Sequence, residues 1–309
     1  MDTRIISLLP AITEILCYLD QGKNIVAKSH ECDFPKEIEK IPSITKSKVK
    51  KKITNDEISK ETINLISQSI SLFDVNVEKL KSLKPDIIFT QEQCAYCSIT
   101  FEELKNLIKD ISNKKIDLIN LNIKSIKDII DSISTIGEVL KLDKHFLNDK
   151  LDQFKFSFHK VSNSGMKNFV SKKVMAIEWL NPLMTAGFWV PEMLKIAGSK
   201  DQFHKHHTVI SNDEIINYNP DIIIFMLCGY EIENSKKNIS NFLSKDKRLL
   251  QTSFYKNKSI YICNANSYFS RPGPRIIEGQ EILNNILAEN ISSNNDQYIN
   301  FFNSDQAYL

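Results

Sequence analysis

Short apolar segments alternate with amphipathic ones along most of the chain. Residues 4–9 and 86–90 are rich in Ile and Leu and have the length of buried strands. Residues 11–19 and 101–111 place apolar side chains at the three- to four-residue spacing of a helix. Alternating strands and helices are typical of parallel sheets, so the pattern predicts an α/β protein. Further strands are expected over residues 24–29, 116–121, 173–179, 221–228 and 259–264, and further helices over residues 77–83, 191–197, 213–217 and 279–287.

A longer amphipathic stretch separates the two series of strands. Over residues 125–161 the apolar positions, from Ile126 and Ile129 to Ile136 and Leu140, follow a 3.6-residue period, with Lys and Asp between them. A single helix of this length would span about 50 Å at about 1.5 Å per residue, more than one small domain needs. We therefore expect one long helix that connects two lobes.

The two series also resemble each other in sequence. Leu83-Lys84-Pro85-Asp86-Ile87 recurs as Tyr218-Asn219-Pro220-Asp221-Ile222, and a predicted short helix with a carboxylate, Glu78 or Glu214, precedes each copy. The sequence therefore predicts two Rossmann-like lobes, residues 1–122 and 165–290, joined by one long connecting helix over 123–164. A loose tail is expected over 291–309, with docking of its Tyr298, Phe301 and Phe302 on a lobe as the alternative. Two such lobes would enclose a cleft, which is a common place for a ligand.

Composition excludes several partners and reactions. The 309 residues carry 40 Lys and Arg against 38 Asp and Glu, a net charge of +2, which gives no reason to expect nucleic acid or an anionic membrane. The longest apolar run, residues 222–228, is far too short to span a bilayer. No apolar signal segment follows Met1, so a cytoplasmic protein is expected, or a periplasmic or cell-surface one if the start is truncated. Phosphate-binding and hydrolase motifs are missing, which argues against nucleotide-dependent catalysis.

The side chains that suggest a binding site follow the predicted strands. In parallel α/β sheets, ligands bind beyond the carboxyl ends of the strands. The aromatic residues there would offer flat apolar contact, and the arginines would face acidic groups of a ligand. These candidate ligand-binding residues are His30, Glu31, Cys32, Tyr96, Glu178, Trp179, Trp189, Cys228, Tyr230, Tyr268, Arg271 and Arg275.

Four of the six cysteines belong to the same predicted edge. Cys32, Cys94, Cys97 and Cys228, with His30 nearby, are a candidate cluster that holds a soft metal or faces the metal of a bound chelate. The alternative is that they are free cysteines packed beneath loops. A thiol- or metal-dependent cytoplasmic enzyme, or a metal-binding protein, would use the same cluster. The run of histidines ending at His207 is expected in a solvated loop, with a metal contact as the alternative.

Several of these motifs together resemble a known family. The opening Ser7-Leu8-Leu9-Pro10 and the Leu83-Lys84-Pro85-Asp86 segment resemble the helical-backbone, or class III, periplasmic binding proteins of cobalamin and ferric-siderophore ABC importers. The closest resemblance is to the branch labelled cobalamin-binding protein. The segments that carry it are His30-Glu31-Cys32-Asp33-Phe34-Pro35, Cys94-Ala95-Tyr96-Cys97, Glu178-Trp179-Leu180-Asn181-Pro182, Trp189-Val190-Pro191-Glu192 and Tyr268-Phe269-Ser270-Arg271-Pro272-Gly273-Pro274-Arg275.

The resemblance implies a monomeric substrate-binding protein that is not an enzyme and requires no cofactor. Its ligand would be a metal chelate, cobalamin-like or ferric-siderophore-like. Leu183 matches an aromatic ligand-contact position of the B12 binders, Asn266 a ligand-contacting Asp, and Arg275 an Arg of the same loop. Glu78 and Glu214 match carboxylates that dock onto arginines of an ABC permease.

Overall fold

The chain forms two compact units. The computed structural model describes residues 3–48, 60, 73–91, 101–111, 115–166, 172–202, 207–289 and 296–303. Unit 1 ends at Phe154 and unit 2 begins at Lys155. Each unit has its own sheet with helices on both faces, so the predicted α/β class with two Rossmann-like lobes is confirmed.

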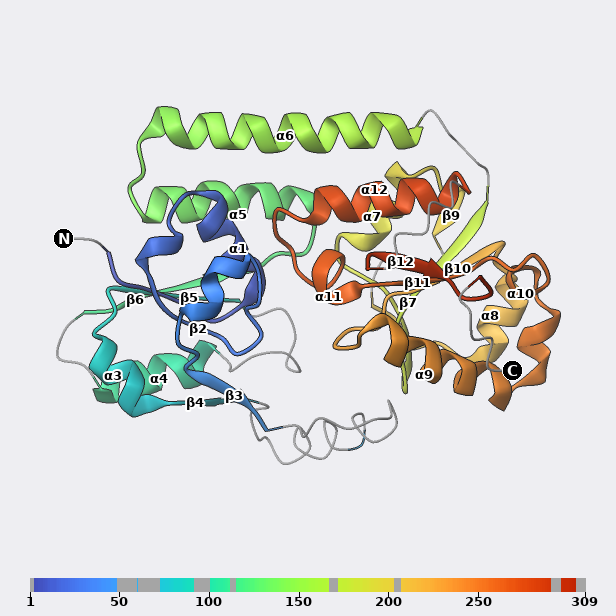
Figure 1. Cartoon of the computed structure of the whole chain (residues 1–309), viewed down its shortest axis with the longest axis horizontal. Helices are drawn as coiled ribbons and strands as arrows, with labels where there is room; N and C mark the ends of the chain where they lie inside the picture. Colours follow the sequence, from blue (N-terminus) through green and yellow to red (C-terminus); the bar gives the residue numbers. More distant parts are fainter. Residues whose placement is uncertain are drawn as a thin grey trace. The chain divides into compact units, whose positions relative to one another are not determined.

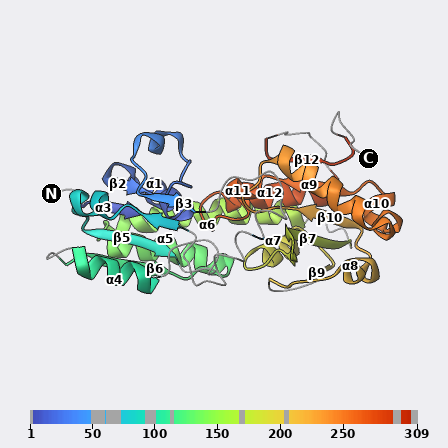
Figure 2. The same ribbon diagram turned by 90° about the horizontal axis from the view of Figure 1, so that it is seen from below.

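Unit 1 is built on a parallel four-stranded sheet. The strands are β1 (Ile5–Ser7), β2 (Ile25–Lys28), β5 (Ile87–Gln91) and β6 (Asp117–Leu121), in the order β2-β1-β5-β6. Helices α1 (Pro10–Tyr18) and α5 (Ile126–Val139) lie on one side of this sheet, and α3 (Val77–Leu83) and α4 (Phe101–Ile111) on the other (Figure 1). β5 and β6 run side by side in both views (Figures 1 and 2). Ile6, Ile88 and Leu104 are among the fully buried side chains that form the core of this unit.

A short antiparallel ribbon, which the apolar pattern does not predict, accompanies this sheet. It pairs β3 (Thr45–Ser47) with β4 (Phe73–Val75), so Ser47 lies opposite Phe73. The backbone N–H of Ile44 donates to the carbonyl of Lys28, and the backbone N–H of Lys28 donates to the carbonyl of Pro42. These two hydrogen bonds join the segment before β3 to the end of β2. The ribbon therefore places Thr45 and Phe73 beside the loop that follows β2.

Unit 2 has a mixed sheet of the order β12-β11-β10-β7-β8, with β9 also paired to β7. Its strands are β7 (Lys173–Leu180), β8 (Leu183–Thr185), β9 (Asp201–Gln202), β10 (Ile222–Phe225), β11 (Ile260–Cys263) and β12 (Tyr298–Asn300). β7, β10 and β11 are parallel, and β8 returns antiparallel to β7. Helices α7 (Val190–Ile196) and α12 (Ile276–Leu287) cover one face, and α9 (Ile232–Lys245) the other (Figure 1). The remaining helices are α8 (Asn212–Tyr218), α10 (Ser253–Lys256) and α11 (Ala265–Tyr268).

The end of the chain is more ordered than expected. The sequence predicts a loose tail over 291–309, but β12 pairs antiparallel with β11, and Tyr298 and Phe301 are 2% and 1% exposed. The prediction of a loose tail is therefore wrong for residues 296–303, where the alternative of docked aromatic side chains is confirmed. Aromatic side chains supply the apolar area that attaches this polar segment to the sheet.

The stretch expected to form one helix consists of two. α5 ends at Val139 and α6 runs over Lys144–Met166. Lys141 adopts a left-handed conformation with φ of 52°, and Leu142.N–H donates to the carbonyl of Gly137, which is a Schellman helix end with lysine in the usual place of glycine. Asp143 then caps α6, because its carboxylate accepts from Phe146.N–H at 2.9 Å. The prediction of one continuous helix is wrong. A helical period of apolar residues does not show where one helix is capped and the next begins.

Within unit 1, α5 and the first part of α6 pack closely. A Cβ on Gly137 would lie 2.4 Å from a methyl carbon of Leu147, so a larger residue here would require the leucine side chain to move. The boundary between the two units falls inside α6, between Phe154 and Lys155. A connecting helix is thus present, but it is α6 alone. Within the described ranges, the structure contains no helix with the length and apolar content needed to cross a bilayer.

The sequence repeat corresponds to a repeated structural element. α3 and α8 both end in a left-handed residue, Lys84 with φ of 44° and Asn219 with φ of 47°. In unit 1, Asp86 accepts from Arg4.N–H at 2.8 Å, and the Arg4 side chain donates to the carbonyl of Leu83 at 2.7 Å.

Unit 2 repeats both contacts of this element. The Asp221 carboxylate accepts from the backbone N–H of Lys173 at 2.8 Å, and Nζ of Lys173 donates to the carbonyl of Tyr218 at 3.0 Å. In both units the aspartate and a basic residue at the start of the first strand join a helix end to the sheet. The repeated Pro-Asp segment therefore has a structural role in both units.

Candidate functional site

Three loops of unit 2 meet at the carboxyl edge of its sheet. Cys228.N–H, after β10, donates to the carbonyl of Glu178 in β7 at 3.2 Å. Gly229.N–H donates to Oδ1 of Asn266, in α11 after β11, at 2.8 Å. These segments therefore lie close together at one edge of this unit. Asn266, expected at a ligand, uses its carbonyl oxygen to join two of the loops.

Trp179 and Tyr230 form an aromatic pair at this edge. Their ring centroids are 5.9 Å apart with an interplanar angle of 53°. Trp179 is partly exposed and its indole N–H donates to the carbonyl of Asn181 at 2.9 Å, whereas Tyr230 is 5% exposed. The buried tyrosine and the backbone carbonyl thus fix the orientation of the tryptophan ring, which gives the edge a flat apolar surface.

Beside this pair lies a contact that sequence reasoning missed. Nδ1 of His207 is 2.5 Å from Oε1 of Glu178, and both side chains are about one-quarter exposed, at 29% and 24%. The His207 ring meets the Phe188 ring edge-on at 4.2 Å, and Phe188 has a positive φ of 54°. A Cβ on Gly187 would lie 2.6 Å from the backbone nitrogen of His207, so this glycine permits the approach. The sequence placed His207 in a solvated loop; the histidines before it lie outside the described residues.

Two predicted contact residues are packed inside unit 2. Trp189 is 3% exposed and stacks on Phe188 at 5.7 Å, and Leu183 in β8 is 8% exposed. The structure therefore places Trp189 in the core of this unit and not at its edge. The Leu183 side chain is likewise buried, so both residues belong to the core of unit 2.

Tyr268 and Arg275 flank the loop that follows α11. The guanidinium carbon of Arg275 is 5.8 Å from the centre of the Tyr268 ring, which is a cation–π distance. Arg271 lies between them in the same loop and is partly buried. The loop returns into α12, where Gly279 approaches Tyr268 so closely that a Cβ would lie 2.6 Å from its carbonyl oxygen.

Replacing Gly279 by alanine is expected to lower the free energy of unfolding. The added methyl group meets backbone, which cannot move away as a flexible side chain can, and overpacking of this kind costs about 1–3 kcal/mol. The better helix propensity of alanine returns at most about 1 kcal/mol. Urea unfolding followed by tryptophan fluorescence measures the change, because both tryptophans lie in unit 2. Glu281→Ala, at an exposed position of the same helix, is the matched control; an equal effect of both variants would contradict the close contact.

At the corresponding edge of unit 1, hydrogen bonds hold the loop after β2. The His30.N–H donates to Oγ1 of Thr45 at 2.9 Å, and Nδ1 of His30 lies 2.7 Å from the same oxygen. The His30 ring also lies 5.1 Å from the ring of Phe73. Burial, and then the nearby ammonium of Lys28, hold the pKa of His30 below its ordinary value. Glu31, the next predicted residue, is exposed.

The described cysteines do not assemble a metal site. Cys32 is 2% exposed and its sulfur accepts from the Thr13 hydroxyl at 3.1 Å, while Cys228 belongs to unit 2. Burial raises the pKa of Cys17 to about 11, which keeps that thiol protonated. Within the residues that the structure describes, no three His, Cys, Asp or Glu side chains come together as a metal-binding set. Cys94, Tyr96 and Cys97 lie outside those residues, so the four-cysteine cluster stays a prediction.

The two carboxylates expected at a permease differ in their surroundings. Glu78 on α3 has a side chain that is 86% exposed and lies 3.5 Å from Lys81. Glu214 on α8 accepts from Ser211.N–H at 2.8 Å and completes a capping box. The N-caps Asn76 and Ser211 place Asp213, not Glu214, at the position equivalent to Glu78. Asp213 pairs with Arg248 at 2.8 Å.

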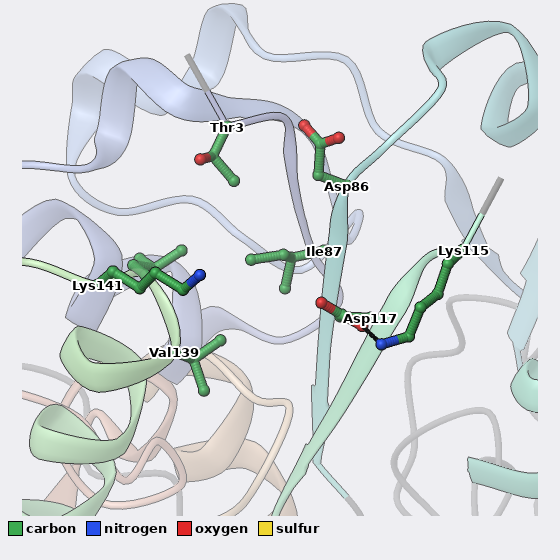
Figure 3. Close-up of a pocket in the computed structure, with 8 residues that line it drawn as sticks. Thr3, Asp86, Ile87, Lys115, Asp117, Val139 and Lys141 are labelled. Atoms are coloured by element: carbon green, nitrogen blue, oxygen red, sulfur yellow. Dashed lines mark ion pairs between the residues drawn. The ribbon is translucent and has the colours of Figure 1, made fainter. Parts of the chain in front are cut away.

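A cavity of about 280 Å³ lies at the opposite, amino edge of the sheet of unit 1 (Figure 3). Thr3, Asp86 and Asp117 line it where β1, β5 and β6 begin. Three of its charged side chains have partners in the fold, since Asp117 pairs with Lys115 at 3.2 Å and Asp86 accepts from the backbone. This cavity is therefore separate from the carboxyl edge and does not resemble a ligand site.

Known proteins share this fold over nearly its full length. The chain is 24% identical over 297 residues to the uncharacterized ABC transporter substrate-binding lipoprotein YvrC of Bacillus subtilis (strain 168), covering 91% of this chain and 78% of that protein. A possible iron-binding, periplasmic solute-binding protein of Staphylococcus epidermidis ATCC 12228 is 25% identical with a TM-score of 0.70, covering 92% and 98% of the two chains.

Two structures of lower identity support the same fold. The periplasmic vitamin B12 binding protein BtuF of Vibrio cholerae is 18% identical with a TM-score of 0.66, covering 93% of this chain and 97% of its own. S. aureus IsdE complexed with heme is also 18% identical, with a TM-score of 0.68 and coverage of 93% and 99%. At this identity the likeness concerns the fold.

These findings correct the expected location. The sequence, judged from its first residues, predicts a cytoplasmic protein. The periplasmic binding protein family matches residues 5–266, and the relative from B. subtilis is a lipoprotein. The cytoplasmic prediction is therefore wrong. The first residues say little about location compared with a match that spans most of the chain.

The family match also favours one of the two classes of function. It covers every parallel strand of both sheets, from β1 in unit 1 to β11 in unit 2. Neither this match nor the relatives support the alternative of a thiol- or metal-dependent enzyme. The chain belongs to the periplasmic binding protein family and is a solute-binding protein of the type that serves ABC transporters.

Proposed function

We propose that this protein binds a metal chelate of the cobalamin or iron-chelate class and presents it to an ABC permease. The chelate is cargo, and the proposal includes no resident cofactor. Support comes from solved structures of the same fold, whose described ligands are vitamin B12, heme and iron. Ligands of this kind are large, flat and partly apolar, so they need an aromatic surface more than a deep pocket.

The observation that carries this proposal is the aromatic pair of unit 2. Trp179 and Tyr230 lie at the carboxyl edge of the sheet, where ligands of parallel α/β folds bind. An indole ring held by a buried tyrosine and a backbone carbonyl loses little side-chain freedom when a ligand binds. Such a ring is suited to stack on a planar chelate.

The loop after α11 supplies the matching charge. Arg275 lies over Tyr268, and a guanidinium in that position can pair with carboxylate or phosphate groups at the margin of a chelate. For the permease, we propose the exposed carboxylates of α3 and α8 as the contacts. On unit 1 the proposed contact is Glu78. On unit 2 the proposed contacts are Glu214 and Asp213, the positional equivalent of Glu78.

Titration with three chelates tests the proposed function. The protein is mixed with aquacobalamin, with ferric protoporphyrin IX and with a ferric hydroxamate siderophore, and quenching of the two tryptophans is followed. At least one chelate is expected to bind with a Kd below about 100 μM, the weak end of useful recognition. Aromatic amino acids and free ferric citrate are the controls. Failure of all three chelates to bind would refute the proposal.

A further inference from the structure

Strand β7 carries one extra residue where it reaches the carboxyl edge of unit 2. Ile177 lies opposite Thr185 of β8, and Trp179 lies opposite the residue next to Thr185, so Glu178 is additional to the pairing. On the other side of β7, the carbonyls of Ile177 and Glu178 both accept from N–H groups that follow β10, at 2.8 and 3.2 Å. In a regular strand, successive carbonyls point to opposite edges. β7 therefore contains a β-bulge at Glu178.

This bulge determines where the Trp179 side chain lies. Successive side chains of a regular strand point to opposite faces of the sheet, and a bulge changes the direction of the side chains beside it. The four residues of β7 before Glu178 are buried, whereas Glu178 and Trp179 are both partly exposed. From this position the Trp179 ring lies 5.9 Å from that of Tyr230. The orientation of the aromatic pair therefore depends on the bulge.

His207 holds the side chain of the bulged residue. Its Nδ1 lies 2.5 Å from Oε1 of Glu178. The backbone that follows His207 is joined to β8, because the carbonyl of Thr208 accepts from the N–H of Thr185 at 3.0 Å. β8 therefore pairs with the bulged strand on one side and with the segment after His207 on the other. The contact between imidazole and carboxylate adds a side-chain link between these two segments.

The His207 ring is confined by its neighbours. A Cβ on Gly187 would lie 2.7 Å from Cδ2 of the ring, and the Phe188 ring meets it edge-on at 4.2 Å. Both ring nitrogens of His207 are buried, so they act on the protein and not on a ligand. The packing fixes the imidazole, and the imidazole in turn restricts the Glu178 side chain.

We propose that His207 is a positioning residue for the ligand-binding edge of unit 2. Through Glu178 it stabilises the bulge of β7, and it thereby holds Trp179 in the orientation that contacts the chelate. Glu178, a candidate ligand contact, is then a second positioning residue, because its carboxylate contacts His207 and its carbonyl accepts from the N–H of Cys228. The inference rests on the proposed function for its ligand, but the effect on Trp179 is measurable without one. Every residue involved belongs to unit 2.

The first arm of the test measures the motion of the Trp179 ring without ligand. Trp189→Phe leaves Trp179 as the only tryptophan, and time-resolved fluorescence anisotropy then reports its rotation. In this background His207→Phe, which keeps a flat ring over Gly187 and removes Nδ1, should add a fast local rotation of Trp179. His207→Asn keeps a nitrogen donor and should add less, and Phe156→Ala should add none. An anisotropy decay of His207→Phe equal to that of its parent would overturn the inference, whether or not a chelate binds.

The second arm measures binding by calorimetry with aquacobalamin, ferric protoporphyrin IX and a ferric hydroxamate siderophore. For each chelate that binds the wild type, His207→Phe should weaken binding about fivefold, within the range by which contacting residues couple, and His207→Asn should recover part of the loss. In a Trp179→Ala background, His207→Phe should cause no further loss, because it acts through that ring.

Two outcomes separate the inference from the proposed function. A further fivefold loss in the Trp179→Ala background would overturn the inference, since His207 or Glu178 would then act on the ligand directly, and would leave the proposed function standing. If no chelate binds the wild type, the proposed function fails, and the anisotropy of Trp179 alone decides whether His207 positions the ring. Thermal unfolding of each variant close to that of its parent excludes misfolding as the cause.

Discussion

Replacing Phe154 by alanine is expected to lower the free energy of unfolding of unit 1 by about 3–5 kcal/mol, the usual cost of truncating a buried phenylalanine. Phe154 on α6 is 1% exposed, and its ring meets that of Tyr18 edge-on at 6.3 Å. Tyr18 in turn donates its hydroxyl hydrogen to the carbonyl of Lys150 at 2.6 Å. The alanine would leave a cavity between α1 and α6 that neither helix can fill without moving.

The same helix offers a matched control. Phe156, two residues on, is 71% exposed, so Phe156→Ala should change stability by no more than about 0.5 kcal/mol. Urea unfolding followed by circular dichroism is the measurement, because both tryptophans lie in unit 2 and their fluorescence does not report on unit 1. Equal losses for the two variants would contradict the orientation of α6 described above.

The second large effect is expected on binding. Trp179→Ala should weaken chelate binding about 30-fold, which corresponds to the roughly 2 kcal/mol typical of a buried aromatic hot spot. The variant removes the flat surface that Tyr230 holds in place at 5.9 Å. Trp179→Phe should keep part of the affinity, because a smaller ring remains at the same edge.

Isothermal titration calorimetry is the appropriate measurement, since the variant retains only Trp189 as a fluorophore. Phe156→Ala, which changes none of the residues proposed to bind the chelate, should bind as the wild type does. A thermal unfolding curve close to that of the wild type excludes misfolding as the cause of any loss. If Trp179→Ala binds as tightly as the wild type, the aromatic pair does not contact the ligand. The arginines of the loop after α11 then become the first candidates.

Much of the fold could be predicted from the chain alone. The apolar runs gave the central strands of both sheets, because a buried parallel strand must be apolar on both faces. The repeated Pro-Asp segment predicted two related units, and the structure shows its reason in the equivalent contacts of Asp86 and Asp221 with the first strands. The loops that carry Trp179, Tyr230 and Asn266 were correctly expected at one edge of unit 2, since parallel strands end together.

Other features depended on tertiary structure. The break at Lys141 was missed because lysine in a left-handed conformation leaves no compositional mark, although Asp143 is an ordinary N-cap. β12 was missed because its pairing partner β11 lies about 35 residues earlier, and because its own segment is short and is preceded by a run of Asn, Ser and Asp. Trp189 was a candidate contact residue, but whether an aromatic side chain is buried depends on its tertiary neighbours, which no local pattern describes.

The site itself shows this division most clearly. His30 could be selected from the sequence as a polar residue after a strand, yet its chemistry depends on Thr45 and Phe73, which come from a ribbon that the apolar pattern did not predict. Likewise, Glu178 was selected, but its partner His207 was not. Strand ends are determined locally by residue type, so the sequence alone determined which loops bear the site. Hydrogen-bond partners are determined by segments far apart in the chain, so only the tertiary structure decided the burial and orientation of each side chain.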